Sequence, residues 1–325
     1  MPFKASSLLR IICQFLLIPI KLLFCRNSIK IFYDEGRLPI LFYPIKNVIF
    51  IIHDVRNYNL TTKHQNFLQR IYFKIIRLSF NRLNKADQIV TPSVFTKTSL
   101  ISLGLNERKI SVIANIIDQN VYRPLDVPKD LLRKELFEKY SIGKDNLYKK
   151  VILYVGSEED RKNIVTILKS LSYLDDYLFI KIGNPIILEN RQKHIAFIEK
   201  YTLNCIFIDN IYTDEDIVKF YNIADVFVFP SLFEGFGRPP IEAQASGCPV
   251  ISSNNSGLKE VVGDSVLILK DPLDEKELYQ KINLILHDYE LKEKIIALGY
   301  ENAKQFILDT NICKWRKILQ KEKLD

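Results

Sequence analysis

The chain has 325 residues, of which 47% are hydrophobic and 26% charged, the balance of an ordinary globular protein. This composition excludes a fibrous repeat and a wholly disordered chain, and the length predicts about two domains. The five cysteines lie far apart without a C-x-x-C pair, and only four histidines are present. The sequence therefore indicates neither a disulfide framework nor a zinc site, and we expect a reduced, cytoplasmic protein.

The net charge of +8 is unevenly distributed along the chain. Residues 1–90 carry 14 Lys and Arg against four Asp and Glu, a net charge of +10, which leaves −2 for the remainder. No nucleic-acid-binding motif accompanies the basic residues, so we expect no nucleic acid as a partner. A basic first part rich in aliphatic residues instead fits peripheral contact with an anionic membrane surface.

Residues 7–25 (SLLRIICQFLLIPIKLLFC) are strongly apolar, but Arg10, Pro19 and Lys21 interrupt them. The uninterrupted run is shorter than the ~20 residues that a membrane-spanning helix needs, and it lacks the small-residue cleavage site of a signal peptide. Two interpretations stay open. The segment is either an interfacial anchor with snorkelling Lys and Arg side chains, or a buried helix of the first domain.

A second basic stretch, residues 66–85, repeats Arg70, Lys74 and Arg77 at helical spacing beside large apolar residues. This pattern predicts an amphipathic helix with one basic face. We favour a solvated basic face, and the alternative is that this face docks on a membrane.

Short apolar runs alternate with helical patterns along the chain. Strands are predicted in the first half at 29–33, 48–53, 88–91 and 109–114. In the second half they are predicted at 151–155, 178–182, 205–208, 226–229, 249–252 and 266–269. The helices between the second-half strands are predicted at 163–174, 190–201, 215–222, 240–246 and 274–288.

This alternation predicts an α/β protein with parallel, doubly wound sheets, arranged as two Rossmann-like domains in tandem. The polar segment 141–150 is the predicted join. We assign residues 1–145 to a basic N-terminal domain and residues 150–300 to a C-terminal domain. Residues 301–325 are expected to form a C-terminal helix that packs back on the first domain.

The loop after the predicted strand 151–155 combines a glycine with two cations. Gly156 permits a tight turn, and Arg161 and Lys162 stand at the start of the following helix. A cation at this helix end is unfavourable against the dipole, which favours a bound phosphate there. Such a ligand requires the three acids of the loop to point away from it: Glu158, Glu159 and Asp160.

The loop after the predicted strand 226–229 carries two carboxylates and two glycines. Gly235 and Gly237 let backbone amides approach a ligand closely. Glu234 and Glu242 suit hydrogen bonding to paired sugar hydroxyls. In the alternative interpretation, which spacing alone favours, Glu234 is solvated and Glu242 complements the helix dipole.

Residues 224–247 (ADVFVFPSLFEGFGRPPIEAQASG) closely resemble the donor-site signature of family-four retaining glycosyltransferases, the glycosyl transferases group 1. The resemblance continues through residues 248–262 and back to 151–171. In the first half it covers 50–54 (FIIHD), 84–98 and 110–124. It implies the GT-B fold, with two Rossmann-like, doubly wound domains facing across a cleft, the first of them short. Several ordered motifs at the right separations make this resemblance specific.

Carried over by position, the resemblance implies three catalytic residues. Glu234 would face the transferred sugar, His53 would contact the sugar near the reacting carbon, and Lys162 would clamp the diphosphate. Glu242 would bind the donor ribose hydroxyls. The other implied donor-binding residues are Arg161, Gly156, Ser157, Gly235, Phe236 and Gly237.

Two of these positions carry an alternative. His53 is otherwise a structural histidine that ends a core strand. Many family members have a basic residue where this chain has Ser157, and Arg161 is the candidate substitute. The family works without a catalytic metal, so Lys162, Arg161 and the helix N-terminus would meet the charge that develops on the leaving phosphate. We interpret the acidic run 214–216 as helix N-terminal acids, not as metal ligands.

The resemblance implies a retaining glycosyltransferase that moves a hexose from a nucleotide-diphosphate sugar to a lipid-linked or glycan acceptor. Polysaccharide, lipopolysaccharide or glycolipid assembly, at the inner face of the membrane, is the expected setting. Neither a metal nor a cofactor beyond the sugar-nucleotide co-substrate is expected. The family's first strand and glycine-rich loop are not visible, since Gly36 is the only glycine before Gly104. The alternatives are therefore a non-catalytic nucleotide-sugar-binding subunit of a glycan-assembly complex and a GT-B sugar-nucleotide epimerase.

Overall fold

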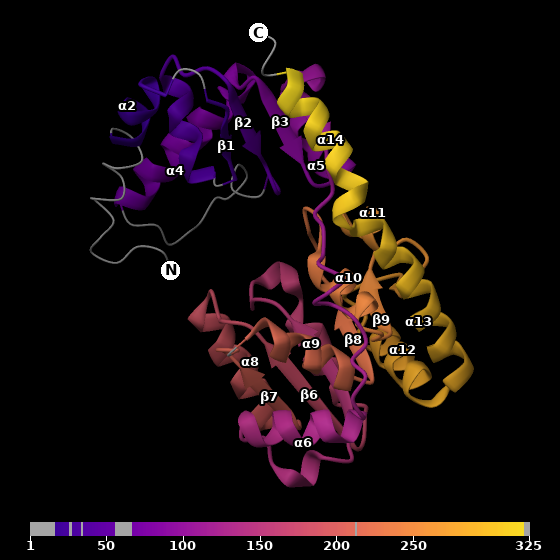
Figure 1. Ribbon diagram of the computed structural model, residues 1–325. Helices are drawn as coiled ribbons and strands as arrows, with labels where there is room; N and C mark the ends of the chain where they lie inside the picture. Colours follow the sequence, from indigo (N-terminus) through magenta and orange to yellow (C-terminus); the bar gives the residue numbers. More distant parts are fainter. Residues whose placement is uncertain (1–16, 26–27, 34, 56–66, 212, 322–325) are drawn as a thin grey trace. The chain divides into compact units, whose positions relative to one another are not determined.

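A computed structural model describes residues 17–25, 28–33, 35–55, 67–211 and 213–321. The chain divides into two compact units, each built on a parallel sheet (Figure 1). The first unit comprises Met1–Asn115 and Asn311–Asp325, and the second comprises Ile116–Thr310. The prediction of an α/β protein with two parallel, Rossmann-like sheets is confirmed.

The first unit holds a four-stranded sheet in the sequential order β1-β2-β3-β4. Alternate residues of each strand point to opposite faces, so each face has its own core. Phe50 and Ile89 contribute to the larger core, which α4 and α5 help to cover. The strands are β1 (Lys30–Phe32), β2 (Val48–Ile51), β3 (Gln88–Thr91) and β4 (Ile110–Val112). The helices are the 3-10 helix η2 (Glu35–Phe42), α4 (Phe67–Phe80) and α5 (Val94–Ser102).

The C-terminal helix α14 (Leu308–Lys321) covers the other face of this sheet, and Figure 1 shows it in yellow beside β3. Ile318 packs there in one cluster with Ile49, Val90 and Ile113. The side chain of Asn311 donates a 2.7 Å hydrogen bond to the carbonyl of Ala114, which fixes the start of the helix. The last segment of the chain thus completes a core that the first 115 residues begin.

The apolar segment 7–25 is only partly described by the structure. Its residues 7–16 lie outside the described residues, and Ile18–Leu23 form the helix α2. Leu22 packs against the first-unit core, whereas Phe24 is 84% exposed. Among the described residues, no helix is both long enough and apolar enough to cross a membrane.

Within the basic stretch 66–85, residues Phe67–Phe80 form the helix α4, and Leu83–Lys85 form a separate 3-10 helix. Ile76 and Phe80 are buried, and Lys74 and Arg77 lie on the exposed face. The side chain of Arg70 lies outside the described residues. The helix therefore has the basic face that the pattern predicts, and membrane docking stays a prediction.

The second unit holds a six-stranded parallel sheet in the order β10-β9-β8-β5-β6-β7. Helices α7, α8 and α12 pack in one layer, and α6, α9, α10 and α13 pack in the other. The strands are β5 (Lys150–Val155), β6 (Tyr177–Ile182), β7 (Cys205–Ile208), β8 (Val226–Phe229), β9 (Val250–Ser253) and β10 (Leu267–Leu269). The helices are α6 (Lys129–Lys139), α7 (Ile164–Leu171), α8 (Leu188–Lys200), α9 (Asp214–Ile223), α10 (Arg238–Ala245), α11 (Leu258–Val262), α12 (Glu275–His287) and α13 (Tyr289–Ala303).

The boundary between the units lies after Asn115, whereas the polar segment 141–150 was the predicted join. Helix α6 accounts for the difference because it packs on α9 of the second unit. Asp225 accepts from Lys129 at 2.7 Å and from Arg133 at 3.0 Å, and it also accepts a 2.8 Å bond from the backbone N–H of Val151. A buried carboxylate thus ties α6 to the sheet, so residues 116–145 belong to the second unit and the assignment of residues 1–145 to the first domain is wrong.

The direction of strand addition reverses between β5 and β8. From β5 the chain adds β6 and β7 on one side, then crosses back to add β8, β9 and β10 on the other. In open parallel sheets, ligands bind outside the carboxyl ends of the strands at such a switch point. The loops that leave β5 and β8 are therefore the place to look for a site in the second unit.

Candidate active site

The loops after β5 and β8 are bound to each other at the switch point. The backbone N–H of Leu232 donates to the carbonyl of Arg161 at 2.7 Å, and the hydroxyl oxygen of Ser231 lies 3.1 Å from the same carbonyl. Gly156 continues the strand ladder by donating to Ile182 at 2.9 Å. These bonds hold the two loops in one fixed arrangement.

Asn163 anchors the start of α7 in a way that spacing does not predict. Its backbone is left-handed, with φ of 57°, a conformation that Asn tolerates better than most residues. Its amide donates to the carbonyls of Pro230 at 3.2 Å and Pro272 at 2.6 Å, and its side-chain oxygen accepts from Thr166 at 2.7 Å. One side chain thereby fixes three loops at the edge of the site.

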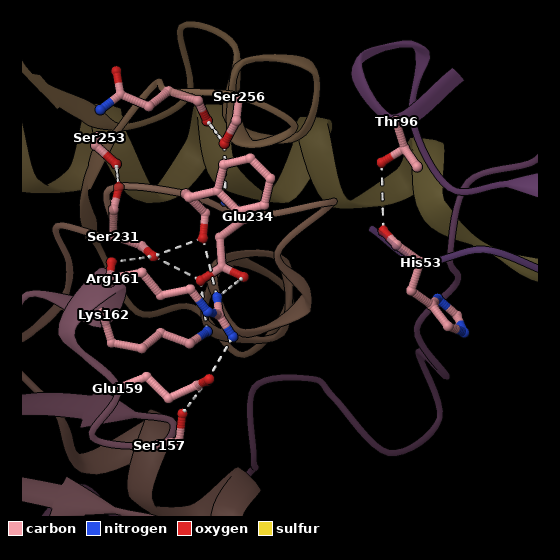
Figure 2. Close-up of polar contacts among 12 residues, drawn as sticks. His53, Thr96, Ser157, Glu159, Arg161, Lys162, Ser231, Glu234, Ser253 and Ser256 are labelled. Carbon is pink, nitrogen blue, oxygen red and sulfur yellow. Dashed lines mark hydrogen bonds and ion pairs between the residues drawn. The ribbon is translucent and has the colours of Figure 1, made fainter. Parts of the chain in front are cut away.

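The carboxylate of Glu234 lies at the centre of the site and pairs with two cations of the neighbouring loop. Lys162 Nζ is 2.6 Å from one carboxylate oxygen and Arg161 is 2.9 Å from the other, as Figure 2 shows. The hydroxyl of Ser231 donates to the same carboxylate at 2.7 Å. The carboxylate and the lysine side chain are each 10% exposed, so the cluster is largely removed from water.

Burial and neighbouring carboxylates have opposite effects on the pKa of each of the two cations, Lys162 and Arg161. Burial lowers the pKa of Lys162, and Glu234 opposes this effect without cancelling it. Burial would also lower the pKa of Arg161, but Glu234 and Glu159 outweigh it and raise that pKa. Arg161 therefore stays charged at any physiological pH, and a negative partner beside Lys162 favours the charged form of that lysine.

The acids of the first loop do not all point away from the cations, as a phosphate ligand would require. Glu159 pairs with Arg161 at 2.8 Å, and the hydroxyl of Ser157 donates to Glu159 at 3.0 Å. Glu158 points away and is buried beside Lys181. Asp160 also points away, because it accepts from Asn190 at 2.8 Å. The expectation was thus correct for two acids and wrong for Glu159, which balances the charge of Arg161.

Close backbone packing gives the second loop its shape. A Cβ on Gly257 would lie 2.3 Å from the carbonyl oxygen of Gly235, so only glycine fits there. Gly237 has φ of +102°, which L residues rarely adopt. The backbone N–H of Glu234 donates to the hydroxyl oxygen of Ser256 at 2.9 Å, and Phe236 is buried. The glycine-rich loop is therefore rigid and lies against the segment after β9.

Glu242 lies on α10 and is 7% exposed. The hydroxyl of Tyr221 donates to its carboxylate at 3.1 Å, and Arg238 lies 3.2 Å from the other oxygen. Burial raises the pKa of Glu242, with Arg238 and Tyr221 opposing the rise. A desolvated carboxylate of this kind gains much from further hydrogen-bond donors. The interpretation of Glu242 as a mere helix-dipole partner is therefore wrong, since Glu242 is buried and lies beyond the first turn of α10. The interpretation of Glu234 as solvated is also wrong, because its carboxylate is buried and paired.

His53 belongs to the first unit, where it follows the carboxyl end of β2. The strand ends at Ile51, two residues earlier than predicted, and the side chain of His53 is exposed. The hydroxyl of Thr96 donates to its backbone carbonyl at 3.4 Å, which connects this loop to α5. The exposure of the ring argues against a histidine that only fills a core.

The acidic run 214–216 begins α9, in agreement with its interpretation as helix N-terminal acids. Thr213 caps the helix by accepting from the backbone N–H of Asp216. The carboxylate of Asp216 accepts from Lys139 and, at 2.7 Å, from Tyr140. Within the part of the chain that the structure describes, no three His, Cys, Asp or Glu side chains group as metal ligands do.

Four polar residues of this site were missed by sequence reasoning. They are hydroxyl and amide side chains, which carry no recognisable spacing signal of their own: Asn163, Ser231, Ser256 and Tyr221. A signal was present for Ser231, since it lies three residues before Glu234 in a loop already singled out. Tyr221 gave none, because only the fold brings α9 beside α10.

Two parallel Rossmann-like units, the second with buried carboxylates and cations at its switch point, define the class of GT-B glycosyltransferases. Solved structures support the fold. HepE of Anabaena, solved with UDP and glucose, aligns with a TM-score of 0.77 over 98% of this chain and 84% of its own, at 18% identity. A glycosyltransferase of Rickettsia africae aligns with a TM-score of 0.72 over 99% and 84%, at 20% identity.

The chain belongs to the glycosyl transferases group 1 family, whose model matches residues 135–302. Glycosyltransferase Family 4 matches residues 35–121. O-antigen chain mannosyltransferase B of Escherichia coli is 29% identical over 81% of this chain and 67% of its own. O-antigen chain mannosyltransferase RfbU of Salmonella typhimurium is 28% identical over 81% and 69%. The predicted family is confirmed.

Proposed function

We propose that this protein is a retaining, metal-independent glycosyltransferase that moves a hexose from a nucleotide-diphosphate sugar to a lipid-linked or glycan acceptor. Polysaccharide, lipopolysaccharide or glycolipid assembly is the proposed setting. Two similar proteins are named as O-antigen chain mannosyltransferases. A third, from Campylobacter jejuni, is named as an N-acetylgalactosaminyltransferase acting on a diphospho-undecaprenol-linked sugar. Mannosyl donors are therefore the first to test.

The observation that carries this proposal is the convergence of Arg161 and Lys162 on Glu234. Two cations in a site of low water content stabilise negative charge better than they would in bulk water. A donor diphosphate supplies such charge, and more of it develops on the leaving phosphate as the glycosidic bond breaks. Arg161 takes the role that a basic residue at position 157 has in many family members.

The remaining proposed roles are those that the family resemblance implies, and for the residues of the second unit their placement at the switch point supports them. Glu234 faces the transferred sugar, and Glu242 binds the ribose hydroxyls with its desolvated carboxylate. The backbone amides of the second loop and of the turn after β5 hold sugar or phosphate; these residues are Gly156, Ser157, Gly235, Phe236 and Gly237. His53, from the first unit, contacts the sugar near the reacting carbon.

The proposed location is the cytoplasm, with peripheral contact at the inner face of an anionic membrane. The basic first part of the chain supports this proposal, because residues 1–90 carry a net charge of +10. Cationic surfaces gain about 1 kcal/mol per Lys or Arg close to an anionic membrane. A lipid-linked acceptor would be held at that surface.

Nucleotide release from UDP-, GDP- and ADP-sugars, with and without crude membrane lipid, tests the proposal. We expect lipid-stimulated release from one donor, lost in Glu234→Gln and retained in the matched exposed-site variant Glu199→Gln. Donor binding without release under any condition would contradict catalysis and favour a non-catalytic subunit of an assembly complex. Donor conversion without acceptor-dependent release would favour an epimerase.

A further inference from the structure

A groove of about 500 Å³ lies in the first unit, along the edge strand β4 and beside α14. Its floor includes Gln88 at the start of β3 and Ser111 on β4, and the amide of Gln88 donates to the hydroxyl of Ser111 at 2.8 Å. Ile113 and Ile318 close the groove from below. All of its lining residues belong to the first unit, so the groove is separate from the donor site.

Four cations from three elements line this groove. Lys97 lies on α5, Arg108 lies in the short helix before β4, and Lys314 and Lys317 lie on α14. Lys97 pairs with Glu107 at 3.0 Å. Among the residues that the structure describes, no carboxylate pairs with the other three cations.

This excess of positive charge is unfavourable in the protein alone. Lys314 and Lys317 are three residues apart on one helix face, and like charges at this spacing repel. Both side chains are exposed, as is Arg108. A multiply charged anion seated in the groove would offset the repulsion and accept hydrogen bonds from three directions.

The dimensions of the groove indicate more than a single bound ion. Ligand pockets in proteins usually measure about 300–1,000 Å³, and this groove lies within that range. Gln88 and Ser111 add neutral hydrogen-bonding groups to the cations, as a site for an organic phosphate requires. Gln88 and Arg108 lie toward the amino-terminal ends of β3 and β4, whereas His53 follows the carboxyl end of β2.

We propose that this groove is a second anion site, which binds the phosphate or diphosphate group of an organic ligand. The site is independent of the proposed donor site, because no residue is shared between them. The phosphate group belongs either to a soluble sugar phosphate or to a lipid headgroup, and both sources offer the same chemistry to the four cations.

The test uses inorganic pyrophosphate as the probe and isothermal titration calorimetry as the measurement. The 325-residue protein should bind pyrophosphate at two sites, the groove and the donor site. Lys314→Glu/Lys317→Glu should weaken the groove site at least about tenfold, which corresponds to ~1.4 kcal/mol. Lys162→Met should weaken pyrophosphate binding at the donor site alone. Loss of binding at the groove can therefore be distinguished from loss of binding at the donor site.

The matched control is Lys276→Glu/Lys294→Glu, which makes the same charge change at two exposed lysines on helices of the second unit. It should leave both sites unchanged. The exposed Arg108→Gln variant gives a second reading should the double variant fold poorly, as judged by its melting temperature. Equal groove affinity in the wild type, the double variant and Arg108→Gln overturns the proposal, as does equal weakening in the control.

Vesicle flotation identifies the source of the phosphate. The probes are phosphatidylcholine vesicles with and without phosphatidic acid. Flotation that requires phosphatidic acid and is lost in the Lys314→Glu/Lys317→Glu variant supports a lipid headgroup as the ligand. Flotation that is unchanged in this variant, together with weaker pyrophosphate binding, supports a soluble phosphate.

Discussion

Two buried carboxylates of the second unit, Glu234 and Glu158, differ in what surrounds them. Glu234 contacts Lys162 and Arg161, whose side chains are 10% and 21% exposed. Glu158 belongs to the loop after β5 and is 0% exposed. The first cluster lies at the switch point between β5 and β8, and the second lies under α8, away from it.

The Glu158 carboxylate is enclosed by three basic side chains. Lys181, itself 0% exposed, lies 2.6 Å from the carboxylate, Arg191 donates at 2.9 Å, and His194 lies at 3.3 Å. Burial alone would raise the pKa of Glu158, but hydrogen bonds from His194, Arg191 and Lys181 outweigh it and hold the pKa well below its ordinary value. All of the charge is compensated within the fold.

Both clusters consist of a buried carboxylate paired with cations, and they differ in their surroundings. A closed cluster contributes to the stability of the fold, because removal of one partner leaves a buried charge uncompensated. The Glu234 cluster lies at the switch point, and we expect its cations to meet a ligand phosphate there. Substitutions in the Glu158 cluster should therefore affect stability, and substitutions in the Glu234 cluster should affect turnover.

The largest expected effect is on stability, from Glu158→Gln. The substitution leaves Lys181 buried without its carboxylate, so the free energy of unfolding should fall by about 3–5 kcal/mol. Urea unfolding followed by circular dichroism measures this loss. Glu199→Gln, on the exposed face of α8, is the matched control and should change little; an equally stable Glu158→Gln protein would remove the distinction between the clusters.

The next effect is on turnover, from Lys162→Met in the Glu234 cluster. Loss of a preorganised cation should reduce kcat by about 10²–10³-fold, since such groups act on charge that develops in the transition state. Single-donor turnover assays measure kcat, and urea unfolding should show a smaller loss of stability than in Glu158→Gln. Wild-type kcat in this variant would contradict a role for Lys162 at the leaving phosphate.

A smaller effect is expected on donor affinity, from Glu242→Ala. Loss of the ribose hydrogen bonds should weaken nucleotide-sugar binding by about 1–3 kcal/mol. Calorimetric titration of the donor measures this change, and Glu260→Ala on the short helix α11 serves as a comparison. Unchanged donor affinity would show that Glu242 has a structural role alone.

The smallest effect is the pH dependence of stability. The folded pKa of Glu158 lies below its unfolded value of about 4.5, so its stabilisation is fully present above that pH and is lost as the pH falls. Wild-type stability should therefore decline below about pH 4.5, and Glu158→Gln should show a shallower decline. Urea midpoints across this pH range measure the two slopes, and parallel slopes would exclude Glu158 as a source of acid sensitivity.

Local sequence patterns predict most of the second sheet. Apolar runs place β7 and β8 at their observed bounds, because short buried strands between helices leave a clear signal in sequence. The helix α6 was not predicted, because its sequence is mostly polar and its attachment depends on the distant Asp225. The predicted strand 48–53 is two residues too long, because β2 ends at Ile51, where its pairing with β3 stops.

The candidate site shows the same difference between what local sequence predicts and what depends on distant contacts. Lys162, Glu234 and Glu242 could be named from their motif, since their types and order are properties of the chain itself. Their partners could not, because the bonds join positions far apart: Glu234 to Lys162 across 72 residues and Asn163 to Pro272 across 109. The burial that turns Glu242 from a solvated acid into a desolvated one likewise exists only in the folded unit.

The sequence by itself determined the fold class, the family and the residues of the donor signature, because all of these are written in local order and spacing. Only the tertiary structure decided that Glu159 balances Arg161, that Glu158 is a closed structural cluster and that α14 completes the first unit's core. Ion pairing and burial depend on distance in space, and separation along the chain does not fix that distance.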